Sequence, residues 1–103
     1  MSKKIKEYVL GKKCIIRTYS AGVWYGKVEI KEKGEIILKN ARRLYYWKTN
    51  GGISLSEVSL TGLHSDSKVQ APVKNVWLQP IEIIPCTEDA IKSIEEKKNY
   101  VVN

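Results

Sequence analysis

Apolar and polar positions alternate along the first half of the chain with the two-residue period of a β-strand. Residues 13–19 are rich in β-branched side chains and end at a Ser-Ala-Gly turn, which predicts a strand. In residues 23–31 the apolar side chains Trp24, Val28 and Ile30 occupy even positions, and charged side chains occupy the odd positions from residue 27 onward. This pattern predicts a half-buried strand with one face in the core and the other in water.

The turns between these runs predict an antiparallel meander. A Glu-Lys-Gly turn at residues 32–34 connects the second strand to an apolar run at residues 35–39. Gly26 interrupts the apolar face of the second strand, which indicates a β-bulge or a close approach of another backbone. Asn40 then breaks the third run.

Residues 41–48, Ala-Arg-Arg-Leu-Tyr-Tyr-Trp-Lys, are the stretch best suited to a binding surface, because they hold two of the three arginines and two of the six tyrosines. In an extended strand the side chains alternate between faces, so both faces would carry a cation and an aromatic ring. This predicts a strand that faces a ligand or lies between protomers. One face would show Arg42, Leu44, Tyr46 and Lys48, and the other Ala41, Arg43, Tyr45 and Trp47.

The second half of the chain predicts two helices and three short strands. Ser54 and Glu57 match a capping box, so a short helix is expected over residues 55–60. Thr87 is a good N-cap for a helix over residues 88–98. The strands expected between them are residues 69–73, 76–78 and 81–84, the last of which is bounded by two prolines.

Together these elements predict an α+β fold that is mostly β. We expect a compact antiparallel sheet or partly open barrel, with one short helix and a C-terminal helix that packs on the sheet as a lid. A length of 103 residues predicts a single domain over residues 1–103. Residues 1–7 are expected to form a basic N-terminal arm, and residues 99–103 a flexible tail.

Composition excludes several classes of function. Apolar runs are too short to span a membrane, and no apolar segment follows the basic N-terminus as in a secretory signal, so a cytoplasmic protein is expected. Cys14 and Cys86 belong to no metal-binding cluster and are expected to be free thiols rather than a disulfide. The only histidine, His64, has Ser65 and Asp66 as its immediate neighbours, and three consecutive residues do not converge as a triad. We therefore expect no enzyme activity, no metal and no cofactor.

A formal net charge of +7 favours anionic partners. Fifteen of the eighteen cations are lysines dispersed along the chain, as in many solvated surfaces. The arginines are better candidates for specific contacts, because a guanidinium offers a planar fork to phosphate oxygens. Arginine beside tyrosine and tryptophan suits a nucleotide, since the rings stack on bases. The predicted ligand-binding residues are Arg42, Arg43, Tyr45, Tyr46, Trp47 and Lys48, joined from neighbouring strands by Arg17 and Tyr25. In the opposing interpretation one set of rings fills the core and the arginines face solvent.

Four stretches resemble a small uncharacterised domain family of phages and prophages. They are residues 17–24 (Arg-Thr-Tyr-Ser-Ala-Gly-Val-Trp), 40–47 (Asn-Ala-Arg-Arg-Leu-Tyr-Tyr-Trp), 54–56 (Ser-Leu-Ser) and 81–87 (Ile-Glu-Ile-Ile-Pro-Cys-Thr). The resemblance extends from about Tyr8 to Ile94, and the sequence departs from it at residues 64–68 and after Glu95. It implies a phage genetic setting, hence the cytoplasm of an infected bacterial cell, and it brings no activity with it.

Three functions follow as hypotheses. The preferred one is a phage-encoded sponge that sequesters a small anionic nucleotide signal of host immunity, such as a cyclic oligonucleotide or a cyclic ADP-ribose derivative, at the junctions of a homo-oligomer. The second is a nucleic-acid-binding module for DNA or RNA, with lysines along the phosphates and aromatic rings on the bases. The third is a protein inhibitor of a host defence protein, which would use the same tyrosine, tryptophan and arginine surface.

Overall fold

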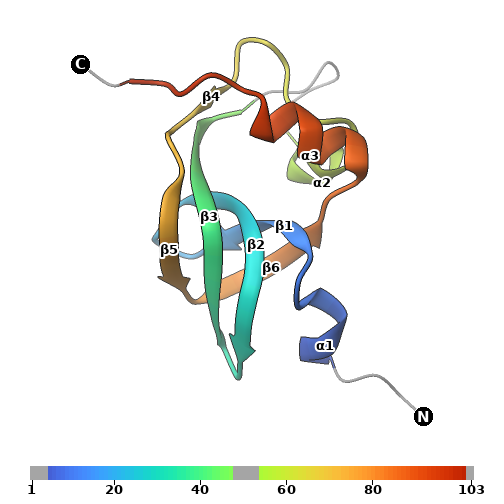
Figure 1. Cartoon of the computed structure of the whole chain (residues 1–103), viewed down its shortest axis with the longest axis vertical. Helices are drawn as coiled ribbons and strands as arrows, with labels where there is room; N and C mark the ends of the chain where they lie inside the picture. Colours follow the sequence, from blue (N-terminus) through green and yellow to red (C-terminus); the bar gives the residue numbers. More distant parts are fainter. Residues whose placement is uncertain (1–4, 48–53, 102–103) are drawn as a thin grey trace.

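The structure is a computed structural model that describes residues 5–47 and 54–101 (Figure 1). The expected fold class, α+β and mostly β with an antiparallel sheet, is confirmed. No helix among these residues is long and apolar enough to cross a membrane. The elements in chain order are α1 (Ile5–Val9), β1 (Lys13–Thr18), β2 (Val23–Glu32), β3 (Glu35–Tyr46), α2 (Leu55–Thr61), β4 (Lys68–Val69), β5 (Val73–Leu78), β6 (Pro80–Pro85) and α3 (Glu88–Glu95).

The strands β1, β2 and β3 form the antiparallel meander that the turn lengths predicted. The second edge of β3 is shared by two strands, because β5 pairs with residues 36–41 and β4 pairs with Leu44 and Tyr46. β6 pairs with the other edge of β1. Only Gln79 separates β5 from β6, although the two strands lie on opposite edges of the sheet. The sheet must therefore curl until these edges approach each other, which gives the expected partly open barrel (Figure 1).

Both faces of the curled sheet are buried over part of their area. The helices α2 and α3 pack against each other and cover one end of the outer face, as the lid interpretation of the C-terminal helix predicted (Figure 1). Beneath them lies an outer core of Ile15, Val23, Tyr25, Leu44, Val58 and Ile94. The inner face holds the larger core, which consists of Val9, Cys14, Ile16, Trp24, Val28, Ile36, Leu38, Ala41 and Leu78.

A β-bulge in β2 decides which of its side chains reach the core. Ile30 lies opposite Ile37, whereas Val28 lies opposite Leu38, so Glu29 is an extra residue on β2. The bulge reverses the alternation of inner and outer positions and brings residue 30 to the outer face, where it is 49% exposed. The prediction that this isoleucine shares the core face with residue 28 is therefore wrong.

A second bulge, at Asn40 of β3, restores the original register. Asn40 has a left-handed backbone with φ of 51°, which asparagine tolerates better than most residues. Gly26 lies opposite the bulge, and a Cβ atom there would come within 3.2 Å of the Lys39 carbonyl oxygen and 3.3 Å of the Ala41 Cα. The close backbone approach predicted for this glycine is confirmed. Because of the bulge, Lys39 and Arg42 both lie on the outer face although they are three residues apart.

The two predicted helices are present, but their ends differ from expectation. Thr87 caps α3 as predicted, since its Oγ1 accepts a hydrogen bond from the Ala90 amide. Ser54 is the N-cap of α2 but makes no capping hydrogen bond with its side chain, so the predicted capping box does not form. α3 ends at Glu95 rather than residue 98, and the chain turns there because the Lys97 amide bonds to the Ile94 carbonyl.

Parts of the predicted arm and tail belong to regular structure among the described residues. Residues 5–7 of the expected arm begin α1, which places the buried Val9 in the inner core. At the other end Asn99 forms a β-bridge with Val69, and the Tyr100 amide donates to the Val69 carbonyl. The remainder of the predicted arm and tail, residues 1–4 and 102–103, lies outside the described residues.

Candidate anion-binding site

Three lysines form a row across the outer face of the sheet, which we call the lysine row: Lys13 on β1, Lys27 on β2 and Lys39 on β3. Lys13 lies directly opposite Lys27, and Lys27 lies directly opposite Lys39. Like charges in such positions, with Cβ atoms about 5 Å apart, destabilise a sheet. Lys13 makes an ion pair with Glu95. Among the described residues, the side chains of Lys27 and Lys39 make no hydrogen bond or ion pair. The row therefore holds uncompensated positive charge.

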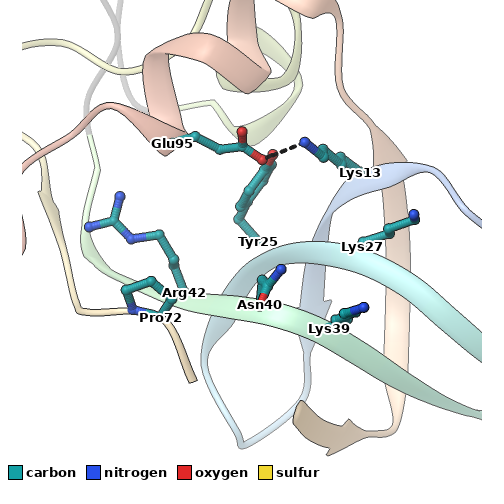
Figure 2. A pocket seen from close by; sticks show the side chains of 8 residues that line it. All are labelled: Lys13, Tyr25, Lys27, Lys39, Asn40, Arg42, Pro72 and Glu95. Atoms are coloured by element: carbon teal, nitrogen blue, oxygen red, sulfur yellow. Dashed lines mark hydrogen bonds and ion pairs between the residues drawn. The ribbon is translucent and has the colours of Figure 1, made fainter. Parts of the chain in front are cut away.

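The lysine row borders a pocket of about 310 Å³ between the sheet and the C-terminal end of α3 (Figure 2). In Figure 2, Glu95 reaches from α3 toward Tyr25 and Lys13, while Lys27 and Lys39 lie on the side opposite Arg42. The lining contains four cations and one carboxylate, so the pocket attracts anions. Its residues are Lys13, Tyr25, Lys27, Lys39, Asn40, Arg42, Pro72 and Glu95.

Glu95 joins α3 to the sheet through two contacts with one carboxylate oxygen. The Tyr25 hydroxyl donates to Glu95 Oε2 at 2.7 Å, and Lys13 Nζ lies 2.8 Å from the same atom. Burial opposes ionisation of Glu95, but the hydrogen bonds from Lys13 and Tyr25 outweigh it and lower the pKa of the carboxyl. Burial, together with the bond to this carboxylate, raises the pKa of Tyr25. At neutral pH the carboxylate is charged and the phenol is neutral.

Arg42 is a structural residue at the wall of the pocket. Its side chain is buried, and its guanidinium donates to the carbonyl oxygens of Gln70 at 2.9 Å and Ile94 at 2.7 Å. Further bonds reach the Val69 carbonyl and Asn99 Oδ1. Four of its five N–H donors are thus occupied by protein atoms. The contact with Ile94 places a cation at the C-terminal end of α3, where the helix dipole favours it. Burial lowers the pKa of Arg42, and an arginine still remains charged at neutral pH.

The other predicted arginines lie away from this pocket. Arg43 stacks over the Trp24 ring at 4.3 Å from its centroid and donates to the Ala21 carbonyl oxygen, on the inner side of the strand. Arg17 pairs with Glu82 of β6 at 3.0 Å, and both side chains are about half exposed. Of the seven predicted site residues that the structure describes, the pocket contains two, Tyr25 and Arg42.

The aromatic end of β3 forms a separate surface. Tyr45 stacks on Tyr100 with ring centroids 5.3 Å apart, and Lys68 lies 5.0 Å from the Tyr100 ring. Tyr46 is exposed, and Lys68 lies 6.0 Å from its ring. Trp47 is half-buried and packs against the outer core, in agreement with the interpretation that one ring fills the core. The predicted site residue Lys48 lies outside the described residues.

The groups most often used in catalysis are placed apart or shielded. Both cysteines are free. Burial raises the pKa of Cys14 to about 11 and that of Cys86 to about 12, so both remain protonated thiols at neutral pH. The His64 Nδ1 atom accepts a hydrogen bond from the Asp66 amide within the same turn. Among residues 5–47 and 54–101, no three His, Cys, Asp or Glu side chains gather as a metal site.

Sequence reasoning missed most of the pocket, including the lysine row and Glu95. The alternation of apolar and charged residues in β2 did indicate that Lys27 lies on the solvent-facing side of the strand. An ideal hairpin closed at residues 33–34 would set Lys27 opposite Asn40, however, and only the bulge at Glu29 brings Lys27 opposite Lys39. The row is therefore a consequence of an irregularity that the pattern of residues did not predict.

A protein family described as a domain of unknown function (DUF6948) has a sequence model that matches residues 11–94. The chain belongs to this family. The DUF6948 match includes all six strands and every residue that lines the pocket except Glu95. Comparisons with curated proteins and with solved structures find no match.

Proposed function

We propose that this protein is a non-enzymatic binding protein that sequesters a small anionic nucleotide in the pocket beside the lysine row. The observation that supports the proposal most strongly is the alignment of three lysines on adjacent strands, two of them without a carboxylate partner among the described residues. Such an arrangement costs stability in the empty protein. A bound phosphate removes that cost, because its oxygens accept charge-assisted hydrogen bonds from the ammonium groups.

The size of the pocket supports a small ligand over a protein partner. About 310 Å³ lies at the lower end of the range for small-molecule sites. Glu95 adds selectivity, because it repels a second anion near Lys13 and directs phosphate oxygens toward Lys27 and Lys39. Burial keeps both cysteines as protonated thiols, which favours capture over turnover.

The genetic setting is part of the same proposal. We infer from the resemblance to a phage domain family that the nucleotide is a signal of host immunity, of the cyclic oligonucleotide or cyclic ADP-ribose type. A sponge acts by lowering the free concentration of its ligand, so it needs tight binding and abundance rather than catalysis. A homo-oligomer in the infected cell stays a prediction of this proposal, and the sedimentation of the protein with and without ligand tests it.

Nucleic-acid binding is a second candidate, favoured by the exposed aromatic end of β3. Tyr45 is 52% exposed and Tyr46 is 44% exposed, and the Lys68 ammonium group lies 6.0 Å from the Tyr46 ring. Such rings stack on single-stranded bases while lysine contacts the phosphates. This surface lies outside the lining of the pocket, so variants separate the two candidates. Tyr45→Ala with Tyr46→Ala should weaken oligonucleotide binding only, and a double Lys27→Gln, Lys39→Gln variant should weaken binding of a small nucleotide.

Calorimetry against a panel of cyclic dinucleotides and cyclic ADP-ribose, beside a single-stranded oligonucleotide, tests the proposal. We expect saturable heat with at least one small nucleotide, and loss of that heat in the Lys27→Gln, Lys39→Gln variant. Lys33→Gln, in the turn between β2 and β3, removes a cation outside the pocket and serves as the matched control.

The salt dependence of binding distinguishes the two candidates. Polynucleotide affinity falls steeply with salt, in proportion to the number of phosphates contacted. A small ligand with two or three phosphates shows a correspondingly shallow slope. Heat with the oligonucleotide alone, or no heat with any small nucleotide, would contradict the proposed function.

A further inference from the structure

Next to the lysine row lies a second row of side chains, all apolar, on the same outer face. Ile30 of β2 lies opposite Ile37 of β3, which lies opposite Trp77 of β5. Together they line a hollow of about 100 Å³. Trp77 is 53% exposed and Ile30 is 49% exposed, so the hollow is open to solvent. We call these three residues the apolar row.

The apolar row and the lysine row are neighbours along the strands. Ile37 precedes Lys39 by two positions on β3, and no bulge of β3 lies between them. Two residues of a strand span about 7 Å, so the two rows are about that far apart. On β5 the same step leads from Trp77 to Asn75, which is paired with Lys39. The outer face thus offers a cationic row and an aromatic surface side by side.

The rim of the hollow that is farther from the lysine row is acidic. Glu32 and Glu35, which face each other at the end of the hairpin, both line the hollow. The Trp77 Nε1 group donates to Glu35 Oε1 at 2.9 Å, and this bond holds the indole ring against the strand. From Lys39 to Glu35 the surface therefore changes from cationic to apolar to acidic.

A nucleotide carries groups that complement this surface in the same order. Its phosphates are anionic, its base has an apolar π-face, and adenine, cytosine and guanine each carry an amino group that donates hydrogen bonds. A protein partner would need a much larger surface than a hollow of this size. Trp77 was not among the residues predicted to bind a ligand, because its strand was recognised only as a short apolar segment.

We propose that the apolar row is a base-binding subsite: a base of the nucleotide stacks on Trp77 over Ile30 and Ile37, with its amino edge toward Glu32 and Glu35. This inference rests on the proposed function and deepens it, because it names the ligand as a nucleotide with an amino-bearing base whose phosphates contact the lysine row. Pyrophosphate fills only the lysine row, and ADP fills both rows.

The test compares pyrophosphate, ADP and UDP as probes of the full chain by calorimetry. ADP should bind more tightly than pyrophosphate, because stacking of a base strengthens binding by about 5- to 150-fold. UDP should bind more weakly than ADP, since its base has no amino group for the glutamates. Trp77→Ala should abolish the advantage of ADP and leave pyrophosphate affinity unchanged, and Trp77→Phe should restore most of it. Tyr19→Ala, which removes a 92% exposed ring at the turn between β1 and β2, is the control.

The outcomes separate the subsite from the proposed function. Equal affinities of ADP and pyrophosphate, or an ADP affinity that Trp77→Ala leaves unchanged, would overturn the subsite while the phosphate site stands. Equal affinities of ADP and UDP would overturn the orientation of the base toward the glutamates. If pyrophosphate, ADP, the cyclic dinucleotides and cyclic ADP-ribose all fail to bind, the subsite and the proposed function are both wrong.

Discussion

Lys27 of β2 and Lys39 of β3 lie directly opposite each other on the outer face of the sheet. Since like charges in this position repel, we expect Lys39→Gln to raise the free energy of unfolding by about 0.2–1 kcal/mol at low salt. The gain should shrink as salt screens the repulsion. Urea denaturation at two ionic strengths measures it. The same variant should bind pyrophosphate more weakly, so the protein would gain stability as it loses affinity.

Lys33→Gln provides the comparison for this prediction. It removes the same charge from the turn between β2 and β3, where no lysine lies opposite. We expect little change in stability and none in pyrophosphate affinity. A stabilisation as large as that of Lys39→Gln would indicate that lower net charge, and not the paired lysines, is responsible.

The regular parts of this fold were predictable from the sequence, and the irregular parts were not. Alternating apolar residues predicted β1, β2 and the start of β3, and turn lengths predicted their antiparallel order. The bulges at Glu29 and Asn40 each insert one residue, so they leave composition and alternation almost unchanged while reversing which face a side chain occupies. The lysine row depends on the bulge at Glu29, and the place of Arg42 on the same face depends on the bulge at Asn40.

The most conspicuous motif also had a different explanation from the predicted one. Arginines beside aromatic rings suggested a ligand surface, but Arg42 contacts carbonyl oxygens of segments 69–70 and 94. Such partners come from distant parts of the chain and belong to the backbone. Sequence patterns describe side chains, so they contained no signal for this set of contacts.

Arg42→Ala should destabilise the fold strongly. It leaves carbonyl acceptors without a donor, and each unsatisfied buried polar group costs about 1–3 kcal/mol. It also removes a cation from the end of α3. We expect a loss of about 3 kcal/mol or more in urea denaturation, and Arg42→Lys should recover only part of it because an ammonium cannot reach all four acceptors.

Arg43→Ala is the matched variant on the next residue. Arg43 makes one hydrogen bond to a carbonyl and a cation–π contact with Trp24, and it is half-buried. We expect a loss of about 1 kcal/mol. Equal effects of the two substitutions would contradict the structural role assigned to Arg42.

Glu95 should make stability depend on pH in the acidic range. Its folded-state pKa is below the ordinary value of 4.5, so the unfolded chain binds a proton more readily than the folded one. The contribution of Glu95 is therefore present at neutral pH and disappears as the pH falls through the folded-state pKa. Urea denaturation of the wild type and Glu95→Gln should show a difference at pH 7 that shrinks as the pH falls below 4.5. A constant difference would exclude ionisation of Glu95 as its cause.

Gly26→Ala should damage both the fold and the lysine row. A Cβ atom at this position lies 3.2 Å from the Lys39 carbonyl oxygen and 3.3 Å from the Ala41 Cα, so β3 must shift at the second bulge. Overpacking of this kind costs about 1–3 kcal/mol. Gly34→Ala, in the hairpin turn, is the control. Gly34 has a φ of 73°, at which an alanine is strained by about 1–2 kcal/mol, and an added Cβ atom there would meet no other atom within 4 Å. The two variants should lose similar stability in urea, whereas only Gly26→Ala should lose pyrophosphate affinity. Normal affinity in both would show that binding does not depend on the alignment of Lys27 with Lys39.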